Sequence, residues 1–98
     1  MNPAKVQRDK IRCLTDLPNI GEAMERDLLL IGITQPGQLM GLNPYEMHQR
    51  LSELTHTQQD PCVIDVFISI VCFMQGDDPL PWWKYTEERK TYLAKLVE

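Results

Sequence analysis

Apolar residues recur along this chain at the three- and four-residue spacing of amphipathic helices, and prolines and glycines divide the pattern into short segments. The first predicted helix starts at Asn2 and Pro3, because Asn caps helices and Pro suits the first helical position. It is expected to end near Leu14. Its expected apolar side consists of Val6, Ile11, Cys13 and Leu14.

The stretch TDLPNIG interrupts the helical pattern before a second helix of about ten residues, which is predicted to start at Glu22. Gly32 is well placed to end that helix, because glycine adopts the left-handed conformation that many helix ends require. Thr34 is then expected to cap a short helix that stops at Gly41.

Two further helices are predicted to begin with a capping residue followed by proline, at Asn43-Pro44 and at Asp60-Pro61. The first has an apolar stripe made of Tyr45, Met47, His48, Leu51 and Leu54. The second, the core helix at about 61–75, is apolar almost all round and ends before Gly76. It is either the centre of the core or a homodimer seam, and the first reading is favoured because a small domain needs a core.

The last predicted helix spans about 86–97, with Thr86 as its cap and Tyr92, Leu93, Leu96 and Val97 facing inward. No segment has the alternating pattern of a strand. The sequence therefore predicts an all-α fold of five or six short helices that cross at steep angles, because the connections are short and contain Pro and Gly. We expect one orthogonal domain of the SAM-like or helix-hairpin-helix type over residues 1–98.

Composition supports a globular protein, with 43% apolar and 24% charged residues among 98. The three cysteines include no Cys-x-x-Cys pair, so reduced thiols are expected rather than a zinc or redox site. Neither a signal peptide nor a membrane span is indicated, because no apolar run is long enough. A cytoplasmic protein is the simplest prediction.

The formal net charge of −4 disfavours overall electrostatic attraction to nucleic acid. The charges are unevenly placed, however. Residues 1–12 have four bases against one acid, giving +3, while residues 13–83 have two bases against ten acids, giving −8. Residues 84–98 have four bases against three acids, giving +1. Positive charge is therefore concentrated at the two ends of the chain.

A helix, a tight Pro-Asn-Ile-Gly loop and a second helix together predict a helix-hairpin-helix motif at about 5–32. The first amides of the second helix have no acceptor within the helix and lie at the positive end of its dipole, so they can bind a phosphate without reading a base. The candidate nucleic-acid-binding residues are Asn19, Ile20, Gly21, Ala23 and Arg26. The alternative is that the bend is only a corner between helices.

The sequence LPNIGEAMERDLLLIGI resembles the helix-hairpin-helix motif of DNA-repair and recombination proteins, in which a Leu-Pro-Gly-Ile-Gly loop opens the second helix. Residues 14–90 more specifically resemble a small bacterial pathogenicity-locus family whose members are often labelled mitomycin-resistance-like. The segments that carry this resemblance are LNPYEMHQRL, DPCVIDVFISIVCFMQG and PWWKYTEERK. It implies the fold and a link to DNA, repair or resistance rather than a defined activity.

Two departures from the DNA-binding motif favour the corner interpretation. Asn19 replaces the first loop glycine, which adds a side chain near the expected phosphate pocket. Glu22 and Glu25 stand at the start of the second helix, where carboxylates repel an incoming anion. Arg26 is the nearest base that could offset them, with help from the first helix if it lies alongside.

The remaining candidate groups have simpler structural explanations. Trp82 and Trp83, with Lys84, Arg89 and Lys90 nearby, could stack on unpaired bases, but one tryptophan filling the core and one half exposed is the favoured reading. The two histidines, His48 and His56, have no partners at metal-ligand or catalytic spacing. We therefore expect no enzyme, no cofactor and no metal.

The leading hypothesis is a non-enzymatic protein that contacts the DNA or RNA backbone weakly and without sequence preference. The alternative is a protein-interaction or homo-oligomerisation module that uses the helix from Pro61 to Met74. Acidic charge over residues 13–83 motivates this alternative.

Overall fold

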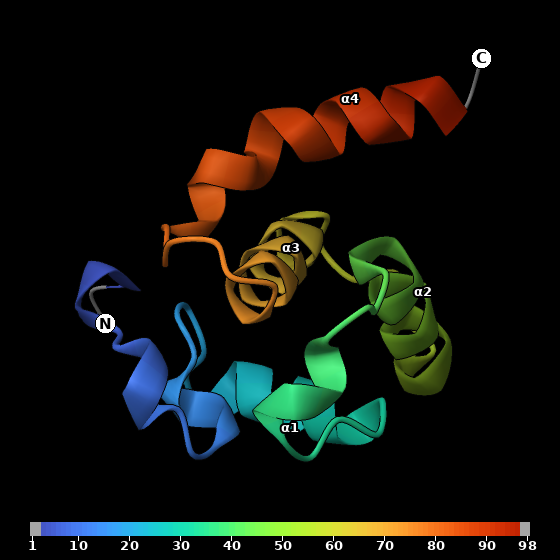
Figure 1. Ribbon diagram of the computed structural model, residues 1–98. Coiled ribbons are helices and arrows are strands. Elements are labelled where there is room, and N and C mark those ends of the chain that lie inside the picture. Colours follow the sequence, from blue (N-terminus) through green and yellow to red (C-terminus); the bar gives the residue numbers. More distant parts are fainter. Residues whose placement is uncertain (1–2, 97–98) are drawn as a thin grey trace.

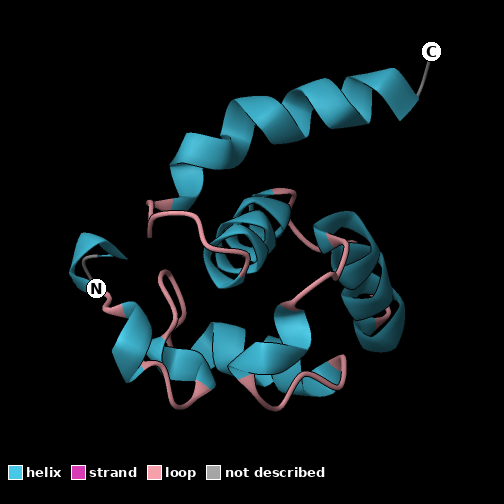
Figure 2. Ribbon diagram, in the orientation of Figure 1, coloured by secondary structure: helices cyan, strands magenta, loops and turns pink. Residues whose placement is uncertain are grey.

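The computed structural model describes residues 3–96, and within them helices joined by loops are present and no strand is (Figure 2). The α-helices are α1 (Glu22–Leu30), α2 (Pro44–Thr55), α3 (Cys62–Met74) and α4 (Thr86–Leu96) (Figure 1). Short 3-10 turns are η1 (Pro3–Lys5), η2 (Arg8–Lys10), η3 (Leu14–Asp16), η4 (Pro36–Leu39) and η5 (Trp82–Tyr85). The all-α prediction is confirmed, whereas five or six helices overstates the four α-helices among the described residues.

The helix expected to end near Leu14 is absent from the described residues, and three separate 3-10 turns take its place. Gln7 and Ile11 have extended backbone angles between these turns. Val6 and Ile11 both pack against the core. Five positions would place them about 140° apart around one α-helix, so a broken chain lets both reach the same core. The predicted cap, Asn2, lies outside the described residues.

The end of α1 follows the predicted glycine pattern. Gly32 has φ +89°, and its N–H donates to Leu29 O at 3.1 Å. The Ile33 N–H donates to Leu28 O at 2.9 Å, which completes a Schellman motif. The next segment differs from the prediction, because it is the 3-10 turn η4 and its cap position is Gln35 rather than Thr34.

Local capping explains where α2 and α3 begin. The side chain of Asn43 accepts hydrogen bonds from Tyr45 N at 2.8 Å and Glu46 N at 3.3 Å. Asp60 accepts from Cys62 N at 2.8 Å, directly before α3. The Asn43-Pro44 start is therefore confirmed, whereas α3 begins at Cys62 with Pro61 at its cap position, one residue later than predicted. Leu54, expected on the apolar stripe of α2, is instead exposed.

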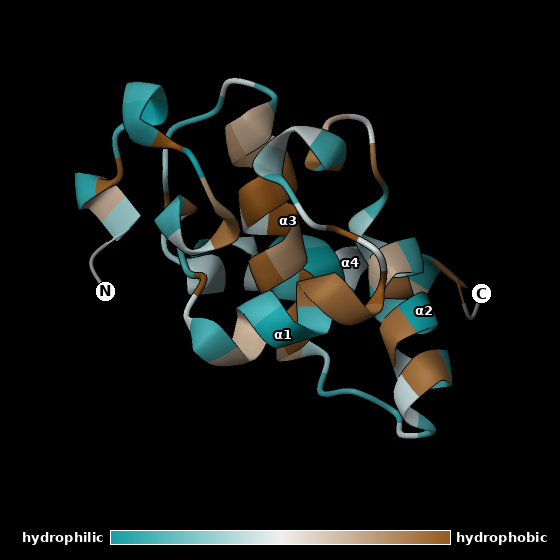
Figure 3. Cartoon of the chain, turned by 90° about the horizontal axis from the view of Figure 1, so that it is seen from below, coloured by the Kyte–Doolittle hydropathy of each residue, from teal (hydrophilic) through white to brown (hydrophobic). Residues whose placement is uncertain are grey.

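Helix α3 is the centre of the molecule, and α2, η4, η5 and α4 all pack on it (Figures 1 and 3). Its side chains are buried on every side from Ile64 to Val71. This arrangement explains the apolar composition of the helix. The homodimer seam weighed for the same helix is not supported, because its apolar surface is already covered within one chain.

Helix α4 lies on α3 and extends beyond it towards the C-terminus (Figure 1). The predicted inward face is only partly correct, because Leu93 is half-buried while Tyr92 and Leu96 are 37% and 63% exposed. Val97 lies outside the described residues. Thr86 does not act as a free cap, since η5 runs directly into α4 and the Thr86 hydroxyl donates to Asp65 at 2.8 Å.

A buried ion pair joins α4 to α3. Arg89 Nε donates to Asp65 Oδ1 at 2.9 Å and Arg89 Nη2 donates to Asp65 Oδ2 at 3.3 Å. The rings of Tyr45 and Tyr92 stack with their centroids 3.7 Å apart, which joins α4 to α2.

Within residues 3–96, no helix combines the length and the apolar character needed to cross a membrane.

Candidate nucleic-acid interface

The bend before α1 packs tightly against the core. Leu17, Pro18 and Ile20 are buried, whereas Gly21 is exposed. Asn19 adopts the left-handed conformation with φ 68°, the geometry for which glycine is usually chosen and which asparagine tolerates. The element before the bend is the 3-10 turn η3 rather than an α-helix, so the described residues contain only the loop and second helix of the expected motif.

The side chain of Asn19 points into the protein rather than towards an incoming phosphate. Its Nδ2 donates to Ser69 Oγ at 3.0 Å and to Leu80 O at 2.9 Å. The Ser69 hydroxyl in turn donates to Val66 O at 2.6 Å. Asn19 therefore ties the bend to α3 and to the linker before η5, and the side chain expected to crowd a phosphate lies elsewhere.

The first amides of α1 are open. Gly21 O accepts from Glu25 N at 2.9 Å, and no side chain caps the helix. The N–H groups of Glu22, Ala23 and Met24 have no acceptor among residues 3–96. Gly21 has φ −103°, and a Cβ built there would meet nothing within 4 Å. The free protein thus leaves room for an anion at this position.

Charges around these amides are mixed. Glu22 and Glu25 occupy the first turn of α1, while Arg26 is exposed and forms no salt bridge among the described residues. Partial burial raises the pKa of Asp27, and the neighbouring charge of Arg26 opposes this shift. Arg8 does not lie free beside the bend, because its guanidinium donates to Phe73 O and Asp77 O.

The structure places the five predicted site residues in different environments. Gly21, Ala23 and Arg26 are exposed at the start of α1. Ile20 is fully buried, so only its backbone could take part. Asn19 is half-buried and its side chain is already bonded. The candidate interface therefore consists of backbone N–H groups at the start of α1 and one exposed arginine, Arg26.

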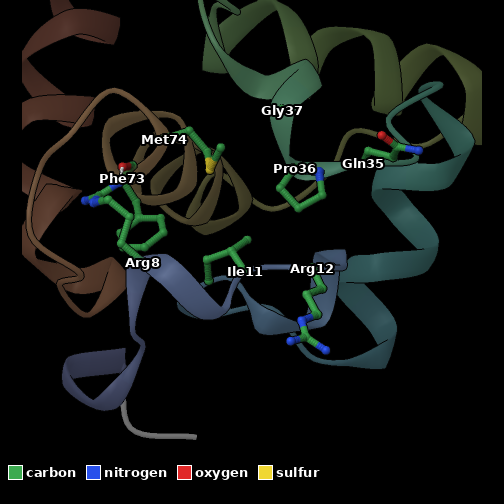
Figure 4. A pocket seen from close by; sticks show the side chains of 8 residues that line it. All are labelled: Arg8, Ile11, Arg12, Gln35, Pro36, Gly37, Phe73 and Met74. Carbon is green, nitrogen blue, oxygen red and sulfur yellow. Dashed lines mark hydrogen bonds between the residues drawn. The ribbon is translucent and has the colours of Figure 1, made fainter.

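A second candidate was not predicted from the sequence. A pocket opens between the N-terminal turns, η4 and the end of α3 (Figure 4). Its lining residues are Arg8, Ile11, Arg12, Gln35, Pro36, Gly37, Phe73 and Met74. The only signal in the sequence was the excess of bases in residues 1–12, since the three segments are far apart along the chain.

Trp82 and Trp83, considered as a base-stacking site, present only one exposed ring. Trp82 is half-buried against the core, while Trp83 is 57% exposed, and their rings meet edge to face at 5.6 Å between centroids. This agrees with the favoured reading of one core residue and one half-exposed residue. Arg89, a base expected beside them, is bound to Asp65.

The remaining titratable groups have structural roles. His48 is buried and its Nε2 lies 2.9 Å from Gln59 O, which holds the connection between α2 and α3. Burial is the main factor that raises the pKa of Cys72 to about 11, so its thiol is protonated at neutral pH. In the described part of the chain, no three His, Cys, Asp or Glu side chains are grouped as they would be around a metal ion.

Comparison with known proteins identifies relatives of the chain. A sequence profile of the Pathogenicity locus family matches residues 7–91. The chain is also 41% identical over 81 residues to the mitomycin resistance protein McrB of Streptomyces lavendulae, a match that covers 83% of this chain and 77% of that protein. No solved structure matches significantly. The profile spans most of the chain, and the chain therefore belongs to the Pathogenicity locus family.

Proposed function

We propose that this chain is a non-enzymatic nucleic-acid-binding protein that holds the DNA or RNA backbone weakly and without sequence preference at the start of α1. The observation that carries the proposal is the set of three consecutive open amides, from Glu22 to Met24, directly after a rigid bend. Such amides, at the positive end of a helix dipole, bind phosphate oxygens. Backbone amides contact phosphate and not base edges, so no sequence is read.

The proposal also includes the fold type. The buried Leu17 and Ile20, the left-handed residue at position 19 and the exposed Gly21 are consistent with a helix-hairpin-helix variant. In this variant, η3 stands where the first helix would be. A role in resistance is part of the proposal and is supported by the relative's name, mitomycin resistance protein McrB.

The local charges set the strength of binding. Arg26 can neutralise one phosphate, while Glu22 and Glu25 repel it. About one phosphate contact predicts a shallow salt dependence, with a slope of about −0.9 for log K against log salt on duplex DNA. The expected affinity is correspondingly weak.

The test is a fluorescence-anisotropy titration of short duplex and single-stranded DNA with the intact protein, at about 50 and 200 mM salt. Gly21→Asp should abolish binding at this site, because the new carboxylate can accept from the open amides and occupy the place of the phosphate. An aspartate at this cap position should also stabilise α1, so the loss cannot be attributed to unfolding.

Gln49→Asp is the matched control, because Gln49 is exposed on α2 and the change in charge is the same. Glu22→Gln should strengthen binding, since it removes a repelling charge without removing an amide. Equal losses for Gly21→Asp and Gln49→Asp would contradict the proposed site, because they would show a response to net charge alone.

The second candidate function is a protein-interaction module. With α3 enclosed, the surface that favours it is the exposed apolar end of α4, where Leu96 and Tyr92 lie. A concentration-dependent dimer in light scattering that Leu96→Lys dissolves, without any binding of nucleic acid at low salt, would favour this function over the first.

A further inference from the structure

The pocket between the N-terminal turns and α3 combines an apolar floor with arginine at its edge. Ile11, Pro36 and Met74 converge at its centre, with Arg8 on one side and Arg12 on the other (Figure 4). None of the lining side chains is acidic. This is notable in a chain whose residues 13–83 have a formal charge of −8.

Arg8 is a fixed wall of the pocket. Its guanidinium donates to Phe73 O and, at 2.6 Å, to Asp77 O, and it lies 4.1 Å from the centroid of the Phe73 ring. Both acceptors are carbonyl oxygens, so these contacts orient the guanidinium without a carboxylate neutralising it. A guanidinium has five N–H donors, and some of those on Arg8 therefore remain for a ligand.

Arg12 is an exposed cation at the rim. Its side chain is exposed and has no hydrogen-bond or ion-pair partner among residues 3–96. In Figure 4 its guanidinium extends outward from the pocket edge. The carboxylate of Asp16 accepts from the backbone N–H groups of Arg12 at 2.9 Å and Cys13 at 3.1 Å. The charge of Arg12 also helps to lower the pKa of Asp16, so an anionic ligand would compete with this carboxylate for the guanidinium.

A ligand that suits this arrangement has a flat, largely apolar part for the floor and an anionic group for the rim. A phosphorylated nucleoside has both. We infer that the pocket binds one nucleotide, with its base against Ile11, Pro36 and Met74 and its phosphate beside Arg12. A free nucleotide and a nucleotide within a single strand share this chemistry, and the experiment below distinguishes the two sources. The inference does not depend on phosphate binding at α1.

The first experiment compares ligands by isothermal titration and by amide chemical shifts of the intact protein. The probes are deoxyadenosine monophosphate, deoxyadenosine, inorganic phosphate and a 5′-phosphorylated oligo-dA of six nucleotides. Both nucleotide probes should shift the amides of Ile11, Gly37 and Met74, while deoxyadenosine and phosphate should bind at least about tenfold more weakly, because each makes only half of the contacts. A clear preference for the oligonucleotide would identify a strand as the source, and equal affinity would identify the free nucleotide.

The second experiment reverses single charges. Arg12→Glu should weaken nucleotide binding by about tenfold or more, because it removes a charge-assisted hydrogen bond. Lys10→Glu is the control, since Lys10 is exposed, belongs to the same N-terminal segment and does not line the pocket. Equal losses for the two variants would overturn the inference. So would tighter binding of a phosphoserine peptide than of the nucleotide.

The two nucleic-acid proposals fail separately. Gly21→Asp should leave the binding of deoxyadenosine monophosphate unchanged, because Gly21 does not line the pocket. A Gly21→Asp protein that loses both duplex and mononucleotide binding would contradict the assignment of two sites.

Discussion

The most direct test of the packing is to break the ion pair between α3 and α4 by Arg89→Met. Asp65 is fully buried and accepts three hydrogen bonds, two from Arg89 and one from Thr86. The Arg89 side chain is only 11% exposed, so water cannot replace it freely. The hydrogen bond from Arg89 to Asp65 is also the main factor that raises the pKa of the guanidinium.

The expected loss follows from the burial of Asp65. Removing one partner of a buried pair costs about 3–5 kcal/mol, because a charge is left without compensation. The lower end applies here, since the Thr86 hydroxyl still donates to Asp65 and α4 lies at the surface. A loss of about 3 kcal/mol in a domain of this length corresponds to a fall of about 12–24 °C in Tm.

A double-mutant cycle separates the interaction energy between Arg89 and Asp65 from the cost of leaving a buried charge without a partner. Asp65→Leu alone should be milder than Arg89→Met, because the long arginine side chain on the surface helix α4 can swing towards water, whereas the fully buried Asp65 cannot. The double variant should be more stable than Arg89→Met, since no buried charge remains. Thermal and urea unfolding followed by circular dichroism measure each corner, with Lys90→Met as the exposed control.

Two results would refute the reasoning about this pair. One is a Tm for Arg89→Met within about 2 °C of the Lys90→Met control, which would mean less than about 0.5 kcal/mol from the pair. The other is strict additivity of Asp65→Leu and Arg89→Met, because residues in direct contact should show a coupling energy.

Further predictions concern two glycines, the cap of α2 and the dependence of stability on pH. Gly21→Ala should change the free energy of unfolding by no more than about 0.5 kcal/mol, whereas Gly32→Ala should lower it by about 1 kcal/mol. A Cβ meets open space at both sites, but only Gly32 has a positive φ. Urea unfolding measures the difference, and equal effects would contradict this explanation. Asn43→Ala should lower the unfolding free energy by about 1 kcal/mol through loss of the α2 cap, and a negligible change in urea unfolding would show that the cap contributes nothing. Hydrogen bonds from the backbone N–H of Arg12 and a second amide lower the pKa of Asp16, so its stabilising effect is present above about pH 4 and is lost as pH falls through the folded-state value. Asp16→Asn should therefore flatten the acid limb of stability against pH, and an unchanged limb would refute this.

The elements that could be predicted from the sequence are those determined by local chemistry. Asn43 caps the start of α2, and the Asp60 carboxylate accepts from the first backbone N–H of α3, that of Cys62. Gly32 ends α1 because a single residue with a positive φ is enough to end a helix, and glycine adopts this conformation readily. Such signals act within a few residues, so they can be read without knowing the fold.

The N-terminal segment could not be predicted in this way. An Asn-Pro start and scattered apolar residues suggested one helix, yet Val6 and Ile11 do not share a helical face. Their positions depend on the core that forms only when α3 is in place. Short isolated helices are marginal in water, so tertiary contacts decide the conformation of such a segment.

The candidate site shows the same limit. The open amides of α1 follow from the bend in the sequence, and so does the exposed Arg26. The inward turn of Asn19 does not, because its partners Ser69 and Leu80 are 50 and 61 residues away. The backbone part of the site therefore stays a prediction, whereas the Asn19 side chain that was expected to obstruct it is bound inside the protein.

The position of the basic N-terminal segment depends on a general property of helix ends. Phe73 O lies in the last turn of α3, at the negative end of the helix dipole, and already accepts from Gly76 N at 3.1 Å. A carbonyl has two lone pairs, so it can also accept from the guanidinium of Arg8. This contact holds the N-terminal turns against α3 and brings Arg12 to the rim of an acid-free pocket. Two basic residues of the N-terminal segment, Arg8 and Arg12, are thus brought to one pocket by the fold. The two candidate phosphate contacts, at Arg12 and at the start of α1, therefore lie on elements that no single sequence motif contains.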